Sequence, residues 1–290
     1  MNKAGNFDAF KRRIRIGVEE HLVRVFSKYP DTEVSRVAKY AVMGGGHRWR
    51  PILAVAAGEI FHHDAFHICM PGACGVELVH AASLLLDDLP STDNAQVRHG
   101  KPCAHLVFPR WAVDMAPAFL VNMSYAISLD NPMVSYERRV TAALEVSQAG
   151  LDMSEGQEID ITQPIEDDDH LLRCYRLKTG ALYAAAAKAD AILCGANEDE
   201  ALLLYECGMN LGLSYQFLDD MADVVAGVEE TGKHSGMDAG KRTAVDLFGI
   251  DGAKARAGRF KQDALSKLKQ FGPEADTLRS LVRDASWAPI

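Results

Sequence analysis

Apolar residues recur every three to four positions along most of the chain, and segments that alternate apolar with polar residues are almost absent. A period near 3.6 residues is typical of α-helices that bury one face, whereas alternation is typical of strands. The pattern predicts helices over residues 8–29, 32–42, 50–61, 71–88, 105–129, 133–149, 168–194 and 197–225, with two weaker helices beginning near 244 and 274. We therefore expect an all-α protein.

Glycine, proline and aspartate mark the boundaries between these helices. Pro30 closes the first helix, and Asp31 is expected to cap the second, which stops at Gly44–Gly46. Residues 227–240 contain four glycines and are expected to form a flexible, functional polar loop. Because no repeat, low-complexity segment or linker interrupts the series, residues 1–290 are expected to form a single domain.

Composition narrows the class of protein. Of the 290 residues, 48% are hydrophobic and 24% charged, and the net charge of −9 disfavours a nucleic-acid partner. Six cysteines without metal-binding spacing suggest reduced core thiols. The start lacks the apolar core of a signal peptide, and the best apolar run, 78–86, contains His80 and Ser83. We therefore expect a cytoplasmic protein without a membrane span.

Two aspartate clusters, separated by about half the chain, are the clearest chemical signal. Their members are Asp87, Asp88 and Asp93 in the first cluster and Asp219, Asp220 and Asp223 in the second. Gln216 precedes Asp219 by three residues, so one helix face presents the amide and the acids together. Oxygen ligands of this kind suit Mg²⁺, which completes its coordination with water and phosphate oxygens. One cluster alone is commonly a solvated helix end, but two predict a site for a diphosphate.

Basic residues follow both the first turn and the first acidic cluster. Arg48 and Arg50 come directly after Gly44–Gly46, where exposed backbone N–H groups and guanidinium groups can hold phosphate. Taken alone, this is more often a simple helix-ending turn. Arg98 and His99 follow the first acidic cluster and would otherwise be read as a surface turn.

Further candidates lie within the helices and the polar loop. His80 and Ser83 share a helix face with Asp87, although a lone histidine in an apolar helix is usually a core residue. Lys178 would normally extend to solvent but would neutralise charge in a diphosphate cavity. Lys233 and Lys241 in the polar loop are expected to close over the site as a cationic lid.

In their order along the chain these motifs resemble those of the trans-isoprenyl (polyprenyl) diphosphate synthases. That family carries Gly-Gly-Lys-Arg-x-Arg-Pro, an aspartate-rich motif with Arg-Arg-Gly-x-Pro, Gly-Gln-x-x-Asp, Lys-Thr-Gly, Phe-Gln-x-x-Asp-Asp-x-x-Asp and Gly-Lys. The matching stretches here are 45–51, 87–102, 156–160, 178–180, 215–223 and 232–233. The resemblance implies a helical bundle around a deep central cavity, usually a homodimer, and head-to-tail condensation of an allylic diphosphate with isopentenyl diphosphate.

The resemblance also implies roles for individual residues. The six aspartates would bind three Mg²⁺ ions on the allylic diphosphate, with Asp87, Asp93 and Asp219 as the main ligands. Residues that would stabilise the departing pyrophosphate or close over it are Arg98, Lys178, Lys233 and Lys241. Residues that would shield the allylic cation are Thr179 and Gln216. Residues that would hold isopentenyl diphosphate are His47, Arg48, Arg50, His80 and His99.

Two positions depart from the family pattern. His47 stands where the family has lysine, and His99 stands where it has the second arginine of its Arg-Arg pair. Both belong to the pocket for isopentenyl diphosphate, and a histidine there loses positive charge near pH 7. These departures put the second substrate in question and leave the allylic site intact.

The first acidic motif also bears on product length. Four residues separate Asp88 from Asp93, as in bacterial and plant geranylgeranyl diphosphate synthases. Ala82 lies five residues before Asp87, about 7.5 Å deeper along the helix, and both it and Ser83 leave the passage for the prenyl tail open. We therefore expect a C20 product first and C15 second, although close packing between helices would also account for Ala82.

Three functions remain open from the sequence. The first is a chain-elongating prenyl diphosphate synthase. The second is a relative that ionises the same allylic diphosphate but acts as a terpene cyclase or transfers the prenyl group to another acceptor, which His47 and His99 favour. The third is a non-catalytic subunit of a heteromeric synthase, which the intact acidic clusters disfavour.

Overall fold

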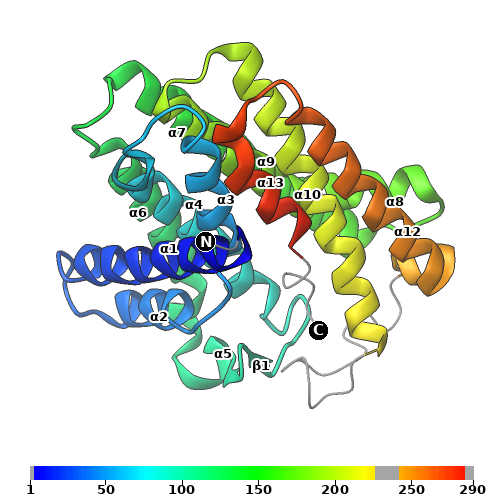
Figure 1. Ribbon diagram of the computed structural model, residues 1–290. Coiled ribbons are helices and arrows are strands. Elements are labelled where there is room, and N and C mark those ends of the chain that lie inside the picture. The colour runs from blue at the N-terminus through cyan, green and yellow to red at the C-terminus, as the bar shows by residue number, and fades with distance from the viewer. Residues whose placement is uncertain (1–2, 226–241, 285–290) are drawn as a thin grey trace.

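The computed structural model describes the backbone of residues 3–225 and 242–284, and almost all of this is helical (Figure 1). The longer helices are α1 (Lys3–Phe26), α4 (Ala65–Asp87), α6 (Arg110–Leu129), α7 (Tyr136–Thr162), α10 (Glu198–Val225) and α12 (Ala244–Lys267). The shorter ones are α2 (Glu33–Val42), α3 (Trp49–Gly58), α5 (Ala104–Val107), α8 (Asp168–Tyr175), α9 (Ala181–Cys194) and α13 (Asp276–Arg283). A π-helical turn, η1 (Arg176–Gly180), and a 3₁₀ turn, η2 (Pro273–Ala275), complete the helices. The predicted all-α class is confirmed.

Helices α3, α4 and α9 form the centre of the bundle. Nearly every residue of α3 and α9 is buried, because both are rich in alanine and other small apolar residues that allow helices to pack closely. Helix α4 packs against α3, α6 and α9. These contacts place the carboxyl end of α4, with its aspartates, next to the amino end of α9.

A second, smaller apolar cluster holds α10 against α12, and the two helices run side by side in Figure 1. Phe217 is fully buried there and contacts the rings of Tyr175, Phe248 and Phe260. Because Phe217 lies between Gln216 and the acids of the second cluster, its burial fixes which face of α10 those polar side chains occupy.

A two-stranded hairpin, β1 (Val97–Arg98) and β2 (Lys101–Pro102), follows the first acidic motif and was not predicted. Val97 pairs with Pro102, and Arg98 pairs with Lys101. His99 and Gly100 form the turn with positive φ angles of 52° and 72°, a conformation that glycine adopts readily. The hairpin turns the chain back toward the glycine-rich segment before α3.

Several predicted boundaries are wrong. Helix α4 begins at Ala65 and continues through Pro71, whose missing N–H is tolerated because the helix is buried among its neighbours. Helix α7 begins only at Tyr136 and extends past Ala149 to Thr162, since buried Gly156 and Ile159 lie in a stretch that reads as polar.

Other predicted helices begin, end or divide differently. The first helix runs from Lys3 to Phe26 rather than over residues 8–29, the third spans residues 49–58, and the segment 105–129 is divided into α5 and α6. The segment 168–194 is interrupted by the π-helical turn η1. The loop predicted over residues 227–240 lies outside the described residues.

The predicted cap of the second helix is also wrong. Thr32, not Asp31, is the N-cap of α2: its hydroxyl accepts a hydrogen bond from the Ser35 N–H, and the Ser35 hydroxyl accepts one from the Thr32 N–H. Asp31 instead forms an ion pair with Arg36 at 2.9 Å. A capping box with two hydrogen bonds therefore outcompetes the carboxylate.

Two described helices, α4 and α6, are long and apolar enough to cross a membrane by length and composition. Most of the apolar window of α4 is buried inside the bundle, which is typical of a core helix. Helix α6 is buried over less than half of its window, and Trp111 and Met115 are exposed on it. The expectation of a protein without a membrane span therefore stays a prediction.

Candidate active site

The first acidic motif surrounds the carboxyl end of α4. Asp87 is the last residue of the helix, Asp88 is its C-cap, and the following loop returns so that the Asp93 N–H donates to the Asp87 carbonyl at 3.0 Å. Asn94 completes this loop with a φ of 49° and an N–H bond to the Leu89 carbonyl at 3.0 Å. The four-residue spacing thus brings Asp93 back beside Asp87.

Asp88 faces a different partner from Asp87. The Arg98 guanidinium on β1 donates two hydrogen bonds to one oxygen of Asp88, from Nη2 at 2.5 Å and from Nε at 3.0 Å. Only 5% of Asp88 is exposed, so this carboxylate is largely neutralised by Arg98. The pair fixes the guanidinium beside the first acidic motif, where its charge also acts on Asp87.

Asp87 carries the chemistry expected of a metal ligand. Burial raises its pKa, nearby Lys178 acts in the opposite direction, and Asp93 raises the pKa further. Because burial and the charge of Asp93 disfavour ionisation of Asp87, a nearby cation would favour its charged form. The donor set therefore fits a hard divalent ion such as Mg²⁺.

Lys178 lies on the π-helical turn η1 and is held by Asp160 on α7. Its ammonium group donates to Asp160 Oδ2 at 2.6 Å. Burial opposes the charge on Lys178, but Asp160 and Asp87 outweigh it and raise its pKa. The close approach depends on Gly156, because a Cβ there would lie 2.3 Å from the Lys178 backbone nitrogen. This contact explains why a glycine stands four residues before Asp160.

The same π-turn connects the two acidic clusters. The hydroxyl of Thr179, next to Lys178, donates a hydrogen bond to the side-chain amide oxygen (Oε1) of Gln216 on α10 at 2.7 Å. Gln216 in turn donates from Nε2 to Asp220 Oδ1 at 3.0 Å. The widened turn aims successive side chains at two helices, Lys178 at the first cluster and Thr179 at the second.

Asp220 is occupied by structural contacts. Its Oδ2 accepts hydrogen bonds from the Tyr175 hydroxyl and, at 2.9 Å, from the Ala244 N–H, while Oδ1 accepts from Gln216. Burial raises the pKa of Asp220 to about 6, although these donors act against the shift. Because both of its carboxylate oxygens accept hydrogen bonds, Asp220 links α8, α10 and α12. Asp219 and Asp223 are therefore the acids of this cluster that the geometry favours as metal ligands.

Asp219 lies on the inner side of α10. Its charge raises the pKa of the phenols of Tyr183 and Tyr215. The Arg50 guanidinium lies over the Tyr183 ring, 4.4 Å from the ring centroid. Asp219 therefore shares the electrostatic environment of Arg50, which lies in the first turn of α3. Asp223 lies one helical turn further on and is partly exposed.

Arg50 and His80 occupy one cationic region. The Nε atom of Arg50 is buried and has no hydrogen-bond partner in the described part of the chain. Burial lowers the pKa of His80 well below its ordinary value, and Arg50, His99 and Arg98 lower it further. Two arginines beside a histidine, with the Arg50 Nε–H left without a partner, are suited to an anionic ligand.

The two unusual histidines border this region. The His99 ring packs against the glycine turn, with its Nε2 3.5 Å from the position a Cβ would take at Gly46. His47 is stacked on Trp49, and burial together with Arg15 lowers its pKa. Arg15 also donates from Nε to the His47 carbonyl at 3.1 Å. The structure therefore brings both histidines to the glycine turn, beside a cation of α1 that sequence reasoning missed.

Arg48 has a structural environment. It is 5% exposed, and its guanidinium donates to Glu77 at 2.7 Å, to Glu19 at 2.6 Å and to the Val42 carbonyl at 2.6 Å. Its φ of 56° places it in the left-handed region, which costs energy for a residue other than glycine. Arg48 thus links α1, the glycine turn and α4. Its guanidinium is occupied by these protein contacts, which do not favour the diphosphate-binding role that the sequence suggested.

The remaining predicted residues fall in two places. Ala82 is 3% exposed within the main core, and the Ser83 hydroxyl donates to the His80 carbonyl at 2.9 Å. Lys233 and Lys241 lie outside the described residues. Arg242, at the near edge of that segment, donates to the carbonyl oxygens of Ile165 and Glu166 at 3.2 and 3.3 Å.

Sequence reasoning missed the partners that hold the site together. Asp160 was part of a recognised motif but received no role, and Tyr175, Tyr183 and Arg15 gave no signal, since each meets its partner across a large sequence separation. Within the described residues no three His, Cys, Asp or Glu side chains converge as a ready-made metal site. A metal here would need oxygen atoms of water or substrate to complete its coordination.

An all-α bundle that brings Lys178 and Arg98 beside one aspartate cluster, and Thr179 and Gln216 beside a second, is suited to holding a polyphosphate anion through cations. A family model described as polyprenyl synthetase matches residues 31–276. The chain therefore belongs to the polyprenyl synthetase family, as the sequence resemblance predicted.

Individual relatives agree with this assignment. The chloroplastic geranylgeranyl pyrophosphate synthase of Catharanthus roseus is 35% identical over 244 residues, covering 81% of this chain and 68% of the relative. A farnesyl/geranylfarnesyl diphosphate (FPP/GFPP) synthase structure from Zymomonas mobilis is 28% identical, with a TM-score of 0.81 over 96% of this chain and 98% of the other. The Helicobacter pylori geranyltransferase complexed with magnesium and isoprenyl diphosphate is 22% identical, with a TM-score of 0.78 over 91% and 95% of the two chains, and supports the fold alone.

Proposed function

We propose that this chain is a Mg²⁺-dependent prenyltransferase that condenses an allylic diphosphate with isopentenyl diphosphate, with geranylgeranyl diphosphate as the main product. The observation that carries the proposal is the π-turn η1, where Lys178 faces the first acidic cluster and Thr179 bonds to Gln216 of the second. Family membership and the relatives described above support the reaction class.

Mg²⁺ fits the acids of both clusters. Asp87 and Asp93 from α4 and its loop, and Asp219 with Asp223 from α10, would hold it together with the diphosphate of the allylic substrate. Bound Mg²⁺ neutralises the negative charge that develops on a departing pyrophosphate. Three ions are proposed on the basis of the family resemblance.

Protein cations assist the same bond cleavage. Lys178, oriented by Asp160, and Arg98, oriented by Asp88, present fixed positive charge where pyrophosphate leaves. The Thr179 hydroxyl donates to the Gln216 side-chain amide oxygen, and the remaining lone pairs of both oxygens would stabilise the allylic cation. The Arg50 and His80 region would hold isopentenyl diphosphate, whose double bond attacks the cation, and a proton then passes to the departed pyrophosphate.

A second candidate function rests on His47 and His99. Burial and Arg15 lower the pKa of His47, so the pocket for the second diphosphate carries less permanent charge than the family motif provides. A terpene cyclase or a transferase to another acceptor would need only the allylic half of the site.

We also propose a homodimer and a cytoplasmic location. Exposed apolar side chains on neighbouring helices α6 and α7, including Trp111, Met115, Leu144 and Leu151, support a subunit interface. The six cysteines are all buried, which is usual for reduced core thiols in a reducing compartment.

A product assay tests the proposed function. Purified protein and Mg²⁺ are incubated with each allylic diphosphate, with and without isopentenyl diphosphate, and the products are identified by mass spectrometry. A longer prenyl diphosphate formed only with isopentenyl diphosphate is the expected result. A hydrocarbon or alcohol formed without it would establish the second candidate, and no consumption of any allylic substrate would overturn both.

A further inference from the structure

Helix α1 has an open groove along its outer side, away from the candidate active site. The groove has a volume of about 560 Å³, and its lining includes Arg12, Ile16, Gly17 and Phe66. Gly17 forms part of the floor because a Cβ there would lie 2.6 Å from the Phe66 ring. Ile16 is 52% exposed at the centre, although it is a large apolar residue. The groove therefore offers an apolar centre that a second helix could cover.

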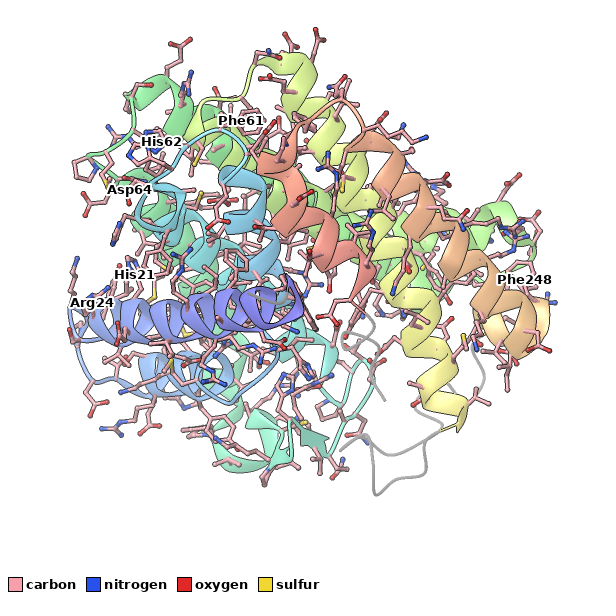
Figure 2. All side chains as sticks on the ribbon, in the orientation of Figure 1. His21, Arg24, Phe61, His62, Asp64 and Phe248 are labelled. Atoms are coloured by element: carbon pink, nitrogen blue, oxygen red, sulfur yellow. The ribbon has the colours of Figure 1, made fainter. Side chains whose placement is uncertain are left out.

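The charges along this side of α1 are arranged symmetrically about Ile16. Arg12 and Glu20 lie four residues to either side of it, and Asp8 and Arg24 lie eight residues to either side. Residues four apart lie on one helix face, so the five side chains form a single ridge. Figure 2 labels Arg24 near the carboxyl end of this helix. Two copies of such a ridge in antiparallel orientation would place every acid opposite a base.

We propose that α1 is a self-association surface through which two copies of this chain pack antiparallel across a two-fold axis at Ile16. With a rise of about 1.5 Å per residue, Arg12 of one copy lies level with Glu20 of its partner, about 6 Å from the axis. By symmetry the pair occurs twice. Asp8 and Arg24 form an outer pair, and exposed Val23 lies level with Ala9.

The central charges are available for this contact. Arg12, Glu20 and Arg24 form no ion pair with any residue that the structure describes, whereas neighbouring Arg13 is bound to Glu59 at 2.8 Å. Asp8 is paired with Lys11 at 3.0 Å but keeps most of its side chain exposed. The self-complementary order favours a second copy over an unrelated partner, because an unrelated partner imposes no symmetry on the sequence.

A contact between two single helices is smaller than the roughly 1,200 Å² that stable interfaces bury. The α1 contact is therefore reversible and depends on protein concentration. It is separate from the α6 and α7 face, and through it two dimers of the proposed kind would associate. Its existence does not depend on the proposed reaction.

A charge-exchange experiment tests the proposal by analytical ultracentrifugation over a concentration series of the full chain. Arg12→Glu or Glu20→Arg turns both symmetric attractions into repulsions and should weaken the association constant at least about tenfold. The double variant Arg12→Glu/Glu20→Arg restores opposite charges and should regain association. Lys254→Glu, at an exposed position of α12, is the matched control and should leave association unchanged. Equal association in wild type and single variants, or no recovery in the double variant, would overturn the proposal.

A crosslinking experiment gives an independent readout. Because all six native cysteines are buried, Ile16→Cys adds the reactive thiol. Oxidised glutathione takes up two electrons as the introduced thiols of two copies join in one disulfide, and two molecules of reduced glutathione leave. A covalent dimer on a non-reducing gel is expected for Ile16→Cys and not for Ile250→Cys, a control at another exposed isoleucine. Equal crosslinking of the two variants, or none in either, contradicts an axis at Ile16.

Discussion

The contact between Lys178 and Asp160 should control how strongly the protein stabilises departing pyrophosphate. Asp160→Asn keeps the size of the side chain but removes the charge that holds the Lys178 ammonium at 2.6 Å. A hydrogen bond between charged groups contributes about 1.5–3 kcal/mol. The ammonium keeps its charge, because Asp87 and Asp93 also favour it, but loses its fixed position. We therefore expect kcat/KM for the allylic substrate to fall about 10- to 100-fold.

The assay compares Asp160→Asn with Lys178→Ala, the double variant and Glu158→Gln. Glu158 is exposed two residues away on α7, so its variant removes the same charge without touching Lys178. If Asp160 acts through Lys178, the double variant should be no slower than Lys178→Ala alone, since residues that work as a unit are not additive. Thermal unfolding checks that all variants fold. Wild-type kcat/KM in Asp160→Asn, or multiplied losses in the double variant, would show that Asp160 does not act through Lys178.

Three further predictions concern the core, the glycine turn and the histidines. Ala82→Phe should shorten the prenyl product, measured by chromatography, whereas an unchanged distribution would place the limit elsewhere. Arg48→Lys should leave Glu19 and Glu77 poorly paired, so the melting temperature should fall by several degrees. The KM for isopentenyl diphosphate should rise more than the KM for the allylic substrate, and an equal rise in the two KM values would argue against a link between Arg48 and the glycine turn. Because the pKa of His47 is lowered in the free protein and a bound diphosphate would raise it, the affinity for isopentenyl diphosphate should be highest at low pH and should fall from about pH 6 to 8. The double variant His47→Lys/His99→Arg should remove this pH dependence, and a wild-type affinity that does not change with pH would contradict the prediction.

Much of the active-site layout follows from local sequence. The end of α4 was predicted within one residue, and the position of the second acidic cluster near the end of α10 and the glycine turn before α3 were also predicted, because apolar periodicity, proline and glycine act over a few residues. The family resemblance added the order of the motifs. These features locate the acids and cations on elements that meet at the centre of the bundle.

The functions of individual acids and bases could not be read from sequence. Asp88 and Asp220 resemble metal ligands in their motifs. In the structure, however, Asp88 is hydrogen-bonded by Arg98, and Asp220 is hydrogen-bonded by Tyr175, Gln216 and Ala244. Arg48 resembles a phosphate ligand but is bound by two buried or half-buried glutamates. These assignments depend on partners far away in the chain, and a motif contains no information about them.

Backbone irregularities were missed for a similar reason. The π-turn η1 lies where α7 approaches it so closely that a Cβ at Gly156 would clash with the Lys178 backbone, and Pro71 lies inside α4, most of whose residues are buried. In both places tertiary packing outweighs local preference. The π-turn lies at the candidate active site, where it aims Lys178 and Thr179 at different helices.

Asp87 and Asp219, on separate helices, are proposed to hold the same diphosphate through Mg²⁺. This is tested by kcat for Asp87→Ala, Asp219→Ala and the double variant under saturating Mg²⁺ and substrates. Each single variant should lose several orders of magnitude in kcat, and no less than about 100-fold, because each already disables the shared site. The double variant should therefore be little slower than either single one. Near wild-type turnover in either single variant, or losses that multiply in the double variant, would show that the two aspartates do not share one metal-bound diphosphate.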